Sequence, residues 1–476
     1  MSGLKQKTIS GVKWSAFSQF STQGISFVIG MILARLLSPE DYGVTGMIVI
    51  FFAISSTFIS SGFGTALIRK QDRTDVDFST VFYFNVVVAI SFYVLLFVSA
   101  PAIARFYEMP ILIPVTRVSA LNLVIGALGG IQQAQFTIRL DFKTPTKIAV
   151  ITTVLSGIVG ITLAYLEYGV WALVLQGTLA SILSTLLFWY WGKWRPLRVF
   201  SIASFRELFA FGSKLLASGL LDTIYNNIYP LIIGKFFSAA QLGFFNRAKG
   251  LSDLPSSNVT NIIQRVTFPV LSELQQDDER LTINYRRILK MSAFIIFPLM
   301  GILMVVAKPL IAFLLTDKWL PAAPYLQLLC LSGMLYPIHA INLNLLQVKG
   351  RSDLFLRLEI IKKILGVTIL GCAIPFGVSG MCLGTVITSY LCLVINTYYT
   401  GKLINLGFFK QAVDLLPTLI LTAISVLGGY AGMIQLNHSL AQIICGGSVT
   451  ALLYLSGSFL LCRTETDEMK QILLKR

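Results

Sequence analysis

Long apolar stretches, separated by short segments rich in Pro, Gly and charged residues, recur from one end of this chain to the other. Each stretch is about 20 residues long, which is enough for a helix to cross the ~30 Å hydrocarbon core of a bilayer. The pattern predicts about fourteen transmembrane helices. The weakest span is 242–272, because Arg247, Lys249, Asp253, Pro255 and Arg265 interrupt it. The predicted spans are 14–36, 44–66, 79–102, 113–135, 146–166, 170–191, 208–233, 242–272, 291–315, 323–346, 355–375, 379–399, 412–433 and 441–461.

Composition agrees with this interpretation. The 476 residues are 55% hydrophobic and only 13% charged, and the mean hydropathy is +0.75. Soluble proteins carry about 25% charged residues. The composition therefore excludes a soluble enzyme, a disordered chain and a secreted disulfide scaffold. The six cysteines lie in or beside apolar stretches without any CxxC spacing, so we expect packing residues and no metal site.

Basic residues alternate between the connections. They precede the first predicted span, follow the second, and recur in every other connection to the C-terminus. The opposite connections contain only Arg105, Lys235, Lys308 and Lys318. Because Lys and Arg stay on the cytoplasmic side, both termini are expected in the cytoplasm. The net charge of +16 then reflects topology and contact with anionic membrane lipids, and we expect no nucleic-acid partner.

The sequence contains an internal repeat. Shifting it by 200 residues aligns Arg35 with Lys235, Ser38 with Ser238 and Gly43 with Gly243. An offset that crosses six spans preserves direction, so the repeats are parallel, related by an axis along the membrane normal. We predict an N-terminal six-helix lobe at 1–205, a second lobe at 206–405, and a final helix pair with a cytoplasmic tail at 406–476. Two such bundles favour alternating access with the substrate path between them, in a monomer.

The eighth predicted span carries a polar stripe. At 100° per residue, Arg247, Asn258, Asn261 and Arg265 fall within about 60° of one another. One interpretation is a helix that is stabilised by a partner helix. The other is the wall of a water-filled path for an anionic, hydroxyl-rich ligand, since charges at mid-membrane are costly and usually face a cavity. Arg binds phosphate oxygens in bidentate fashion, and Asn pairs with sugar hydroxyls.

Two other spans add candidates for the same path. The seventh presents Asp222 and Asn226 on one face. Asp222 either titrates as a carboxylate that couples transport to H⁺ or Na⁺, or pairs with a basic residue. Arg117 is the weaker counterpart in the first lobe. The predicted substrate-binding set is therefore Arg247, Arg265, Asn258, Asn261, Asn226 and Arg117, with Asp222 as the coupling-ion candidate and no catalytic residue, metal or organic cofactor.

Five segments resemble the colanic-acid-exporter group of the oligosaccharide flippases. This polysaccharide transporter family belongs to the MOP (multidrug/oligosaccharidyl-lipid/polysaccharide) exporter superfamily. The similar segments are KQKTISGVKWSA at 5–16, 63–70, 136–143, RVTFPVL at 265–271 and KWLPAAPYLQLLC at 318–330.

The resemblance implies fourteen helices in two six-helix lobes plus a final pair, in the bacterial inner membrane. It also implies a flippase for undecaprenyl-diphosphate-linked oligosaccharide repeat units, destined for exopolysaccharide, capsule or lipopolysaccharide O-antigen. Polysaccharide polymerase machinery is a further expected partner. The first lobe lacks the acidic cluster of the sodium site in drug-exporting relatives, so the coupling ion stays open.

Three alternatives remain at this point. A lipid II flippase would also handle a diphosphate headgroup. A multidrug exporter of the same superfamily would line its path with carboxylates, whereas this chain has an excess of Arg and Lys. A membrane glycan polymerase or transferase would need a large outer loop or a His/Asp/Glu cluster, and the sequence has neither. The absence of a GxxxxGK[ST] motif further favours a secondary transporter.

Overall fold

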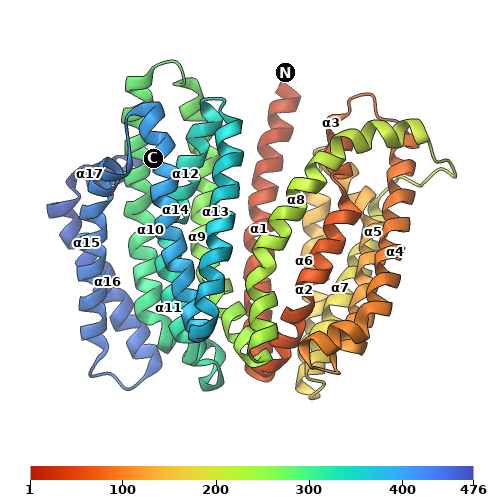
Figure 1. The fold of residues 1–476 in the computed structure, drawn as a ribbon, viewed down its shortest axis with the longest axis horizontal. Coiled ribbons are helices and arrows are strands. Elements are labelled where there is room, and N and C mark those ends of the chain that lie inside the picture. The colour runs from red at the N-terminus through yellow and green to blue at the C-terminus, as the bar shows by residue number, and fades with distance from the viewer. Residues whose placement is uncertain (1, 475–476) are drawn as a thin grey trace. The chain divides into compact units, whose positions relative to one another are not determined.

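A computed structural model describes the backbone of residues 2–474, with side chains described except at 2–13, 15, 16, 266 and 472–474. All regular structure in this part of the chain is helical, which confirms the predicted all-α class (Figure 1). By their contacts the residues form two compact units, here called unit 1 (Met1–Gly243) and unit 2 (Phe244–Arg476). The predicted repeat boundaries at 205 and 405 stay a prediction.

Unit 1 is a bundle in which α4 packs on α5, α5 and α6 pack on α7, α1 packs on α6, and α2 packs on α8. An aromatic cluster around Phe63, Phe82 and Trp194 fills one end. Gln132 Nε2 of α5 donates to the Trp194 carbonyl at 2.9 Å and joins α5 to the segment after α7. The helices are α1 Ser2–Leu36, α2 Pro39–Ser60, α3 Phe63–Arg69, α4 Asp75–Tyr107, α5 Leu112–Ile138, α6 Lys143–Tyr165, α7 Val170–Trp191 and α8 Ile202–Phe236.

Unit 2 is organised around α10, which packs against α11, α15 and α16. Tyr285, Phe297 and Met300 of α10 are almost completely buried there. The elements are α9 Ala239–Glu273, α10 Asp278–Leu315, η1 Asp317–Trp319, α11 Ala322–Met334, α12 Tyr336–Val348, α13 Ser352–Ala373, η2 Ile374–Phe376, α14 Gly377–Ile404, α15 Phe408–Met433, α16 Ser439–Leu461 and α17 Arg463–Leu474. The first five residues of α9 belong to unit 1.

Within the described residues, 11 helical segments are long and apolar enough to cross a membrane. One of them, Ser352–Ile404, contains both α13 and α14. Helices α8 and α9 are 35 residues each, long enough to span, but they are too polar to be counted. Each of the fourteen predicted spans falls on one helix or one helix pair, while the number fourteen stays a prediction.

Two predicted spans are broken helices. The span at 44–66 divides into α2 and α3 because Ser61 and Gly62 both adopt left-handed backbone conformations, with φ of 41° and 70°. The span at 323–346 divides into α11 and α12, where Pro337 occupies the first turn of α12. The segment after 461, predicted as a tail, contains the helix α17.

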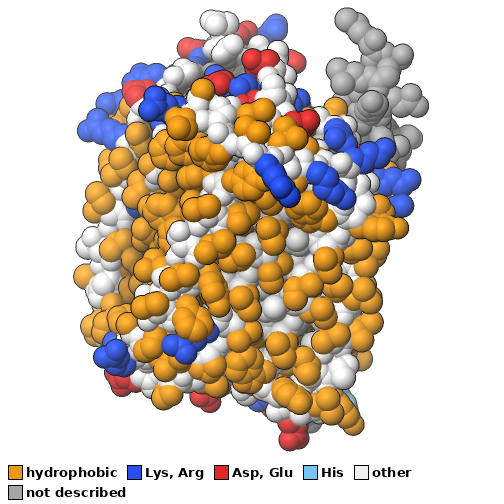
Figure 2. Space-filling model, turned by 90° about the vertical axis from the view of Figure 1, so that its right-hand side faces the viewer, with side chains coloured by type: hydrophobic (Ala, Val, Ile, Leu, Met, Phe, Trp, Pro, Cys, Tyr) orange, Lys and Arg blue, Asp and Glu red, His pale blue; other side chains and the backbone are white. Residues whose placement is uncertain are grey.

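The outer surface suits a lipid environment. Figure 2 shows apolar side chains over most of one face, with Lys and Arg gathered toward its ends. Helix α4 alone exposes Val87, Ile90, Val94 and Val98, each with 46% or more of its surface accessible. A water-soluble bundle buries such positions, so this surface is explained by hydrocarbon as the solvent.

The sequence repeat reappears in the helix ends. Helices α1 and α8 end at Leu36 and Phe236, 200 residues apart. Ser38 and Ser238 then accept hydrogen bonds from the backbone N–H groups of Asp41 and Gln241, both at 3.2 Å. Such side-chain caps satisfy the free N–H groups of a first helical turn. The chain therefore enters α2 and α9 by the same turn.

Two glycines let the starts of α2 and α9 meet closely within unit 1. A Cβ on Gly43 would lie 1.7 Å from the carbonyl oxygen of Ala239. Reciprocally, a Cβ on Gly243 would lie 2.0 Å from the carbonyl oxygen of Pro39. Since both neighbours are backbone atoms that cannot rotate away, only glycine fits at either position.

Candidate functional site

Helix α9 is polar because it packs through small and hydroxyl side chains. Ala248, Ser252, Ser256 and Thr260 recur every four residues on its buried face. Ser252 and Ser256 approach Gly333 of α11, where a side chain would not fit without displacing its neighbours. Ser256 and Thr260 donate to carbonyls one turn earlier, at 3.1 and 2.6 Å. Close helix packing through small residues is a membrane-protein solution, and it explains the low hydropathy of α9.

The other face of α9 carries the predicted stripe. Asn261 and Arg265 are exposed, whereas Arg247 and Asn258 are half-buried. The Arg247 guanidinium lies 5.6 Å from the ring centroid of the fully buried Trp319. Asn258 Nδ2 donates to the Leu254 carbonyl at 2.8 Å. The two arginines are about 27 Å apart along the helix axis, close to the ~30 Å thickness of the hydrocarbon core.

Exposed charge also occurs between these arginines along the helix, on a different side from the stripe. Lys249 and Asp253 form an i,i+4 ion pair at 3.0 Å, with about half of each side chain accessible. A helix that presented an ion pair, Asn261 and Arg265 to lipid would pay several kcal/mol. The exposed face of α9 is therefore best explained by contact with water or with a polar ligand.

Helix α8 carries two of the three predicted residues of unit 1. Asp222 and Asn226 are exposed and follow Lys214 and Ser218 at four-residue spacing, so the four lie along one side of the helix. The opposite side is fixed on α2, where a Cβ on Gly212 would lie 2.4 Å from the Ser61 carbonyl oxygen.

A polar contact and an ion-pair group fix α8 further. The hydroxyls of Thr57 and Thr223 hydrogen-bond at 3.0 Å. Near the N-terminal end of α8, Lys70 Nζ bridges the carboxylates of Asp77 and Glu207, at 3.2 and 2.9 Å. Hydrogen bonding to Glu207 raises the pKa of Lys70, so the bridge stays charged.

Arg117 has a different environment from the α8 residues. Its Nε donates to the Phe97 carbonyl of α4 at 3.3 Å, and its guanidinium lies 4.3 Å from the centroid of the Phe97 ring. The structure thus places Arg117 in the contact between α4 and α5. Of the predicted set, α9 carries Arg247, Asn258, Asn261 and Arg265, α8 carries Asp222 and Asn226, and α5 carries Arg117.

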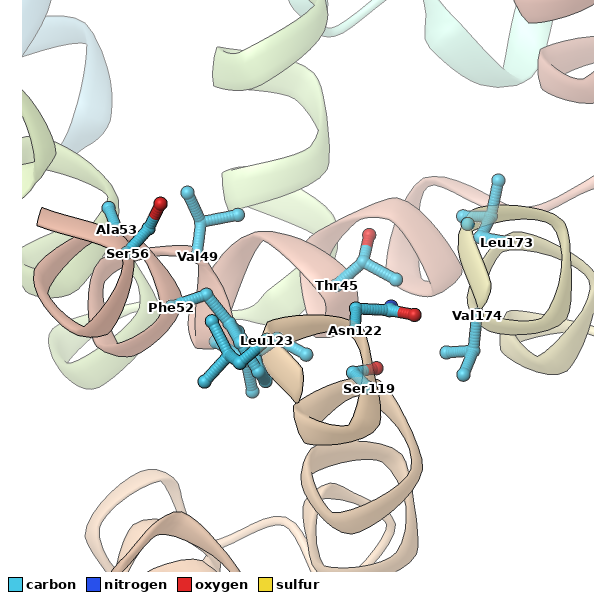
Figure 3. A pocket seen from close by; sticks show the side chains of 12 residues that line it. Thr45, Val49, Phe52, Ala53, Ser56, Ser119, Asn122, Leu123, Leu173 and Val174 are labelled. Atoms are coloured by element: carbon cyan, nitrogen blue, oxygen red, sulfur yellow. The ribbon is translucent and has the colours of Figure 1, made fainter. Parts of the chain in front are cut away.

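Sequence reasoning missed a cavity of about 490 Å³ in unit 1, which is open to the surface because its lining residues Val49 and Gly177 are exposed. Helix α2 contributes residues from Thr45 to Ser56, α5 contributes Ser119 and Asn122, and α7 contributes residues from Leu173 to Gly177. Figure 3 shows Ser119 and Asn122 pointing from α5 toward the space between α2 and α7. The sequence offered only a weak signal, because Asn122 is one of several polar residues in the predicted span 113–135.

The Asn122 amide is incompletely bonded. Its Oδ1 is buried and has no hydrogen-bond partner among the residues that the structure describes. Leaving such a group unsatisfied costs about 1–3 kcal/mol. By contrast, the Thr45 hydroxyl at the same cavity already donates to the Tyr42 carbonyl at 3.0 Å.

Unit 2 also contains a cluster of cations that is structural. Arg286 of α10 donates from Nε and Nη2 to both oxygens of Asp414 of α15, at 2.7 and 2.6 Å. Lys290 lies 3.4 Å from the same carboxylate. Arg287 pairs with Glu468 of α17 at 2.8 Å. These pairs join α10 to α15 and α17, and they leave each cation with a carboxylate partner.

The described residues contain no group of three or more His, Cys, Asp or Glu side chains close enough to bind a metal ion. His339 is half-buried and bonds through its two ring nitrogens to Ser389 at 3.0 Å and Asn396 at 3.1 Å. Its role is to join α12 to α14.

Taken together, these features define a multi-pass membrane protein of helical bundles with a charged helix face and an uncharged cavity. Residues 32–324 match the family described as polysaccharide biosynthesis protein, and the chain belongs to this family. The predicted membership in the polysaccharide transporter family is confirmed.

Two relatives and one solved structure illustrate the match. The chain is 29% identical to the teichuronic acid biosynthesis protein TuaB of Bacillus subtilis, over 74% of each chain. It is 28% identical to the lipopolysaccharide biosynthesis protein WzxC of Escherichia coli, over 76% of this chain and 74% of that one. The fold is similar to that of the lipid II flippase MurJ in an inward closed conformation, with a TM-score of 0.76 and 16% identity over 94% of this chain and 98% of that chain.

Proposed function

We propose that this protein is a flippase that translocates undecaprenyl-diphosphate-linked oligosaccharide repeat units across the bacterial inner membrane for surface polysaccharide biosynthesis. It works as a secondary transporter by alternating access and not as an enzyme. Both termini lie in the cytoplasm, and the protein acts as a monomer. Family membership supports the substrate class, because the relatives are named for teichuronic acid and lipopolysaccharide biosynthesis.

The single observation that carries the proposal beyond the family is the exposed polar face of α9. A diphosphate requires cations, and Arg265 supplies an exposed guanidinium near the C-terminal end of α9. Arg247 supplies a half-buried guanidinium near the other end, 5.6 Å from the ring centroid of Trp319. Sugar hydroxyls require amides, and Asn258 and Asn261 lie between the two arginines. The undecaprenyl chain needs no protein site because it can remain in the bilayer.

Helix α8 offers the complementary groups of unit 1. Asn226 is exposed and available to sugar hydroxyls, and Asp222 is the candidate for H⁺ or Na⁺ coupling. Arg117 is the least favoured member of the set, since its guanidinium lies on Phe97.

The decisive experiment uses a strain that lacks this protein. Its lipids are extracted, and undecaprenyl-diphosphate oligosaccharide on the cytoplasmic face is measured against the parent strain. We expect complete, unpolymerised repeat units trapped inside, together with loss of surface polysaccharide. The plasmid-borne gene should correct both defects.

Two other outcomes would overturn the proposal. Units that reach the outer face but stay unpolymerised would identify a polymerase. Accumulation of lipid II with cell lysis and normal surface polysaccharide would identify a peptidoglycan precursor flippase.

A further inference from the structure

The cavity of unit 1 has walls from three helices and no charged side chain. Its volume of about 490 Å³ lies in the range of small-molecule sites in proteins, about 300–1,000 Å³. All of its lining residues lie between Thr45 and Gly177, so the cavity belongs to unit 1 alone. The stripe on α9 therefore does not contribute to it.

The chemistry of the walls restricts what the cavity can bind. The walls offer a phosphate no cation, so they cannot compensate for the water that it would lose on binding. A purely apolar chain would leave the buried Oδ1 of Asn122 without a partner. The suitable ligand is uncharged, donates hydrogen bonds from hydroxyls and has apolar faces.

A sugar ring has these properties. Its hydroxyls can exchange hydrogen bonds with the Asn122 amide and the Ser119 hydroxyl, while its C–H face can pack on the half-buried ring of Phe52. We propose that this cavity is a sugar subsite, which holds an uncharged pyranose of the glycan during transport. The proposal rests on the proposed function and adds to it a place for the sugar that is separate from the phosphate-binding cations.

Gly177 provides a way to fill the cavity without disturbing the fold. It lines the cavity from α7, and a Cβ built on it meets no atom within 4 Å. Gly177→Leu would therefore project into the space that the sugar would occupy. Gly371 on α13 is the matched control, because it is also exposed and helical with open space around a Cβ, and it lies in unit 2.

The binding test uses a single new cysteine. All six native cysteines lie between Cys330 and Cys462, so unit 1 contains none. Gly177→Cys in the full-length protein, purified in lipid nanodiscs, is labelled with a maleimide, and the labelling rate at residue 177 is measured by peptide mass spectrometry. The exposed native Cys372 serves as the internal reference.

Three additions to the nanodiscs distinguish the occupants. They are undecaprenyl phosphate, a lipid extract from cells that make the repeat unit, and an extract from cells that lack its glycosyltransferases. We expect at least fivefold slower labelling with the glycan-containing extract alone. Equal protection by undecaprenyl phosphate would assign the cavity to the isoprenoid chain. Labelling that none of the three additions changes would show that the cavity is not a ligand site. Either result overturns the proposal.

Transport provides the second readout. Gly177→Leu should lower the export of repeat units at least tenfold at an unchanged amount of protein in the membrane, and Asn122→Leu about fivefold. Gly371→Leu should export normally. If the deletion strain traps repeat units but Gly177→Leu exports them normally, the sugar subsite is wrong and the flippase function stands. If the deletion strain traps none, the proposed function itself fails.

Discussion

The cavity of unit 1 and the exposed face of α9 in unit 2 solve different problems of recognition. The cavity offers one buried amide, a few hydroxyls and apolar walls without a charged group. The α9 face offers two arginines and two amides. A lipid-linked oligosaccharide contains both an uncharged glycan and a charged diphosphate. The difference suggests that the two halves of the chain have specialised for these two parts.

Equivalent starting points led to these unlike surfaces. Helices α2 and α9 begin 200 residues apart, behind the same serine cap. The buried residues of α2 nevertheless include Val44, Met47, Ile48 and Ile50, whereas those of α9 are mainly alanine, serine and threonine. Small buried side chains let α9 approach its neighbours closely, and its two arginines are left on the opposite face.

The largest effect is expected where the two halves share geometry. Gly43→Ala and Gly243→Ala each place a Cβ within 2.0 Å of a backbone oxygen. Relief requires the helices to separate, at a cost above about 3 kcal/mol. We expect little folded protein in the membrane, as measured by fluorescence-detected size exclusion. Gly64→Ala, whose Cβ meets no atom within 4 Å, should fold normally. Normal folding of Gly43→Ala and Gly243→Ala would contradict the close approach of α2 and α9.

The next effect tests the charged half of the comparison. Arg265→Ala removes an exposed guanidinium that makes no packing contribution to the core. A charge-assisted hydrogen bond contributes about 1.5–3 kcal/mol, so export should fall tenfold or more. The amount of protein in the membrane should not change, and Arg265→Lys should retain part of the activity.

Arg280→Ala is the control for this change, since Arg280 is 75% exposed near the start of α10 and pairs only three residues away with Asp277. It should export repeat units at the normal rate. Export by Arg265→Ala at the same rate would remove Arg265 from the substrate path.

A smaller effect separates structural cations from those of α9. Arg286→Ala leaves Asp414, whose side chain is 3% exposed, with Lys290 as its remaining cation. The loss should lower the stability of the purified protein by about 2 kcal/mol, measured as a decrease in Tm. Adding Asp414→Asn should recover part of it, because the uncompensated charge is then gone. In Lys249→Ala the broken pair is exposed, and the loss should stay below about 0.5 kcal/mol. Equal destabilisation by both changes would contradict the distinction.

Hydropathy and charge carried most of the fold prediction. Every predicted span falls on a helix or helix pair, because backbone in a bilayer must satisfy its own hydrogen bonds and long apolar runs have no other solution. The helix breaks at Ser61 and Pro337 were less visible, since both lie inside apolar runs. The amphipathic helix α17 was missed because its charged residues resemble a solvated tail.

The candidate site was likewise predicted only in part from the sequence. Helical periodicity alone placed Arg247, Asn258, Asn261 and Arg265 on one side of α9, because residues on one helix have fixed angular relations. Periodicity gave no account of Arg117, whose partner Phe97 comes from another helix.

The sequence by itself therefore determined the membrane class, the family resemblance, the repeat and the polar stripe. All of these follow from the order of residues along the chain. Only the tertiary structure decided that Gly43 and Gly243 must lack side chains, that Arg286 belongs to Asp414, and that Asn122 faces a cavity. The reason is physical: a cavity, a close approach and a buried ion pair each depend on atoms from helices that are distant in sequence, and local periodicity contains no information about which helices meet.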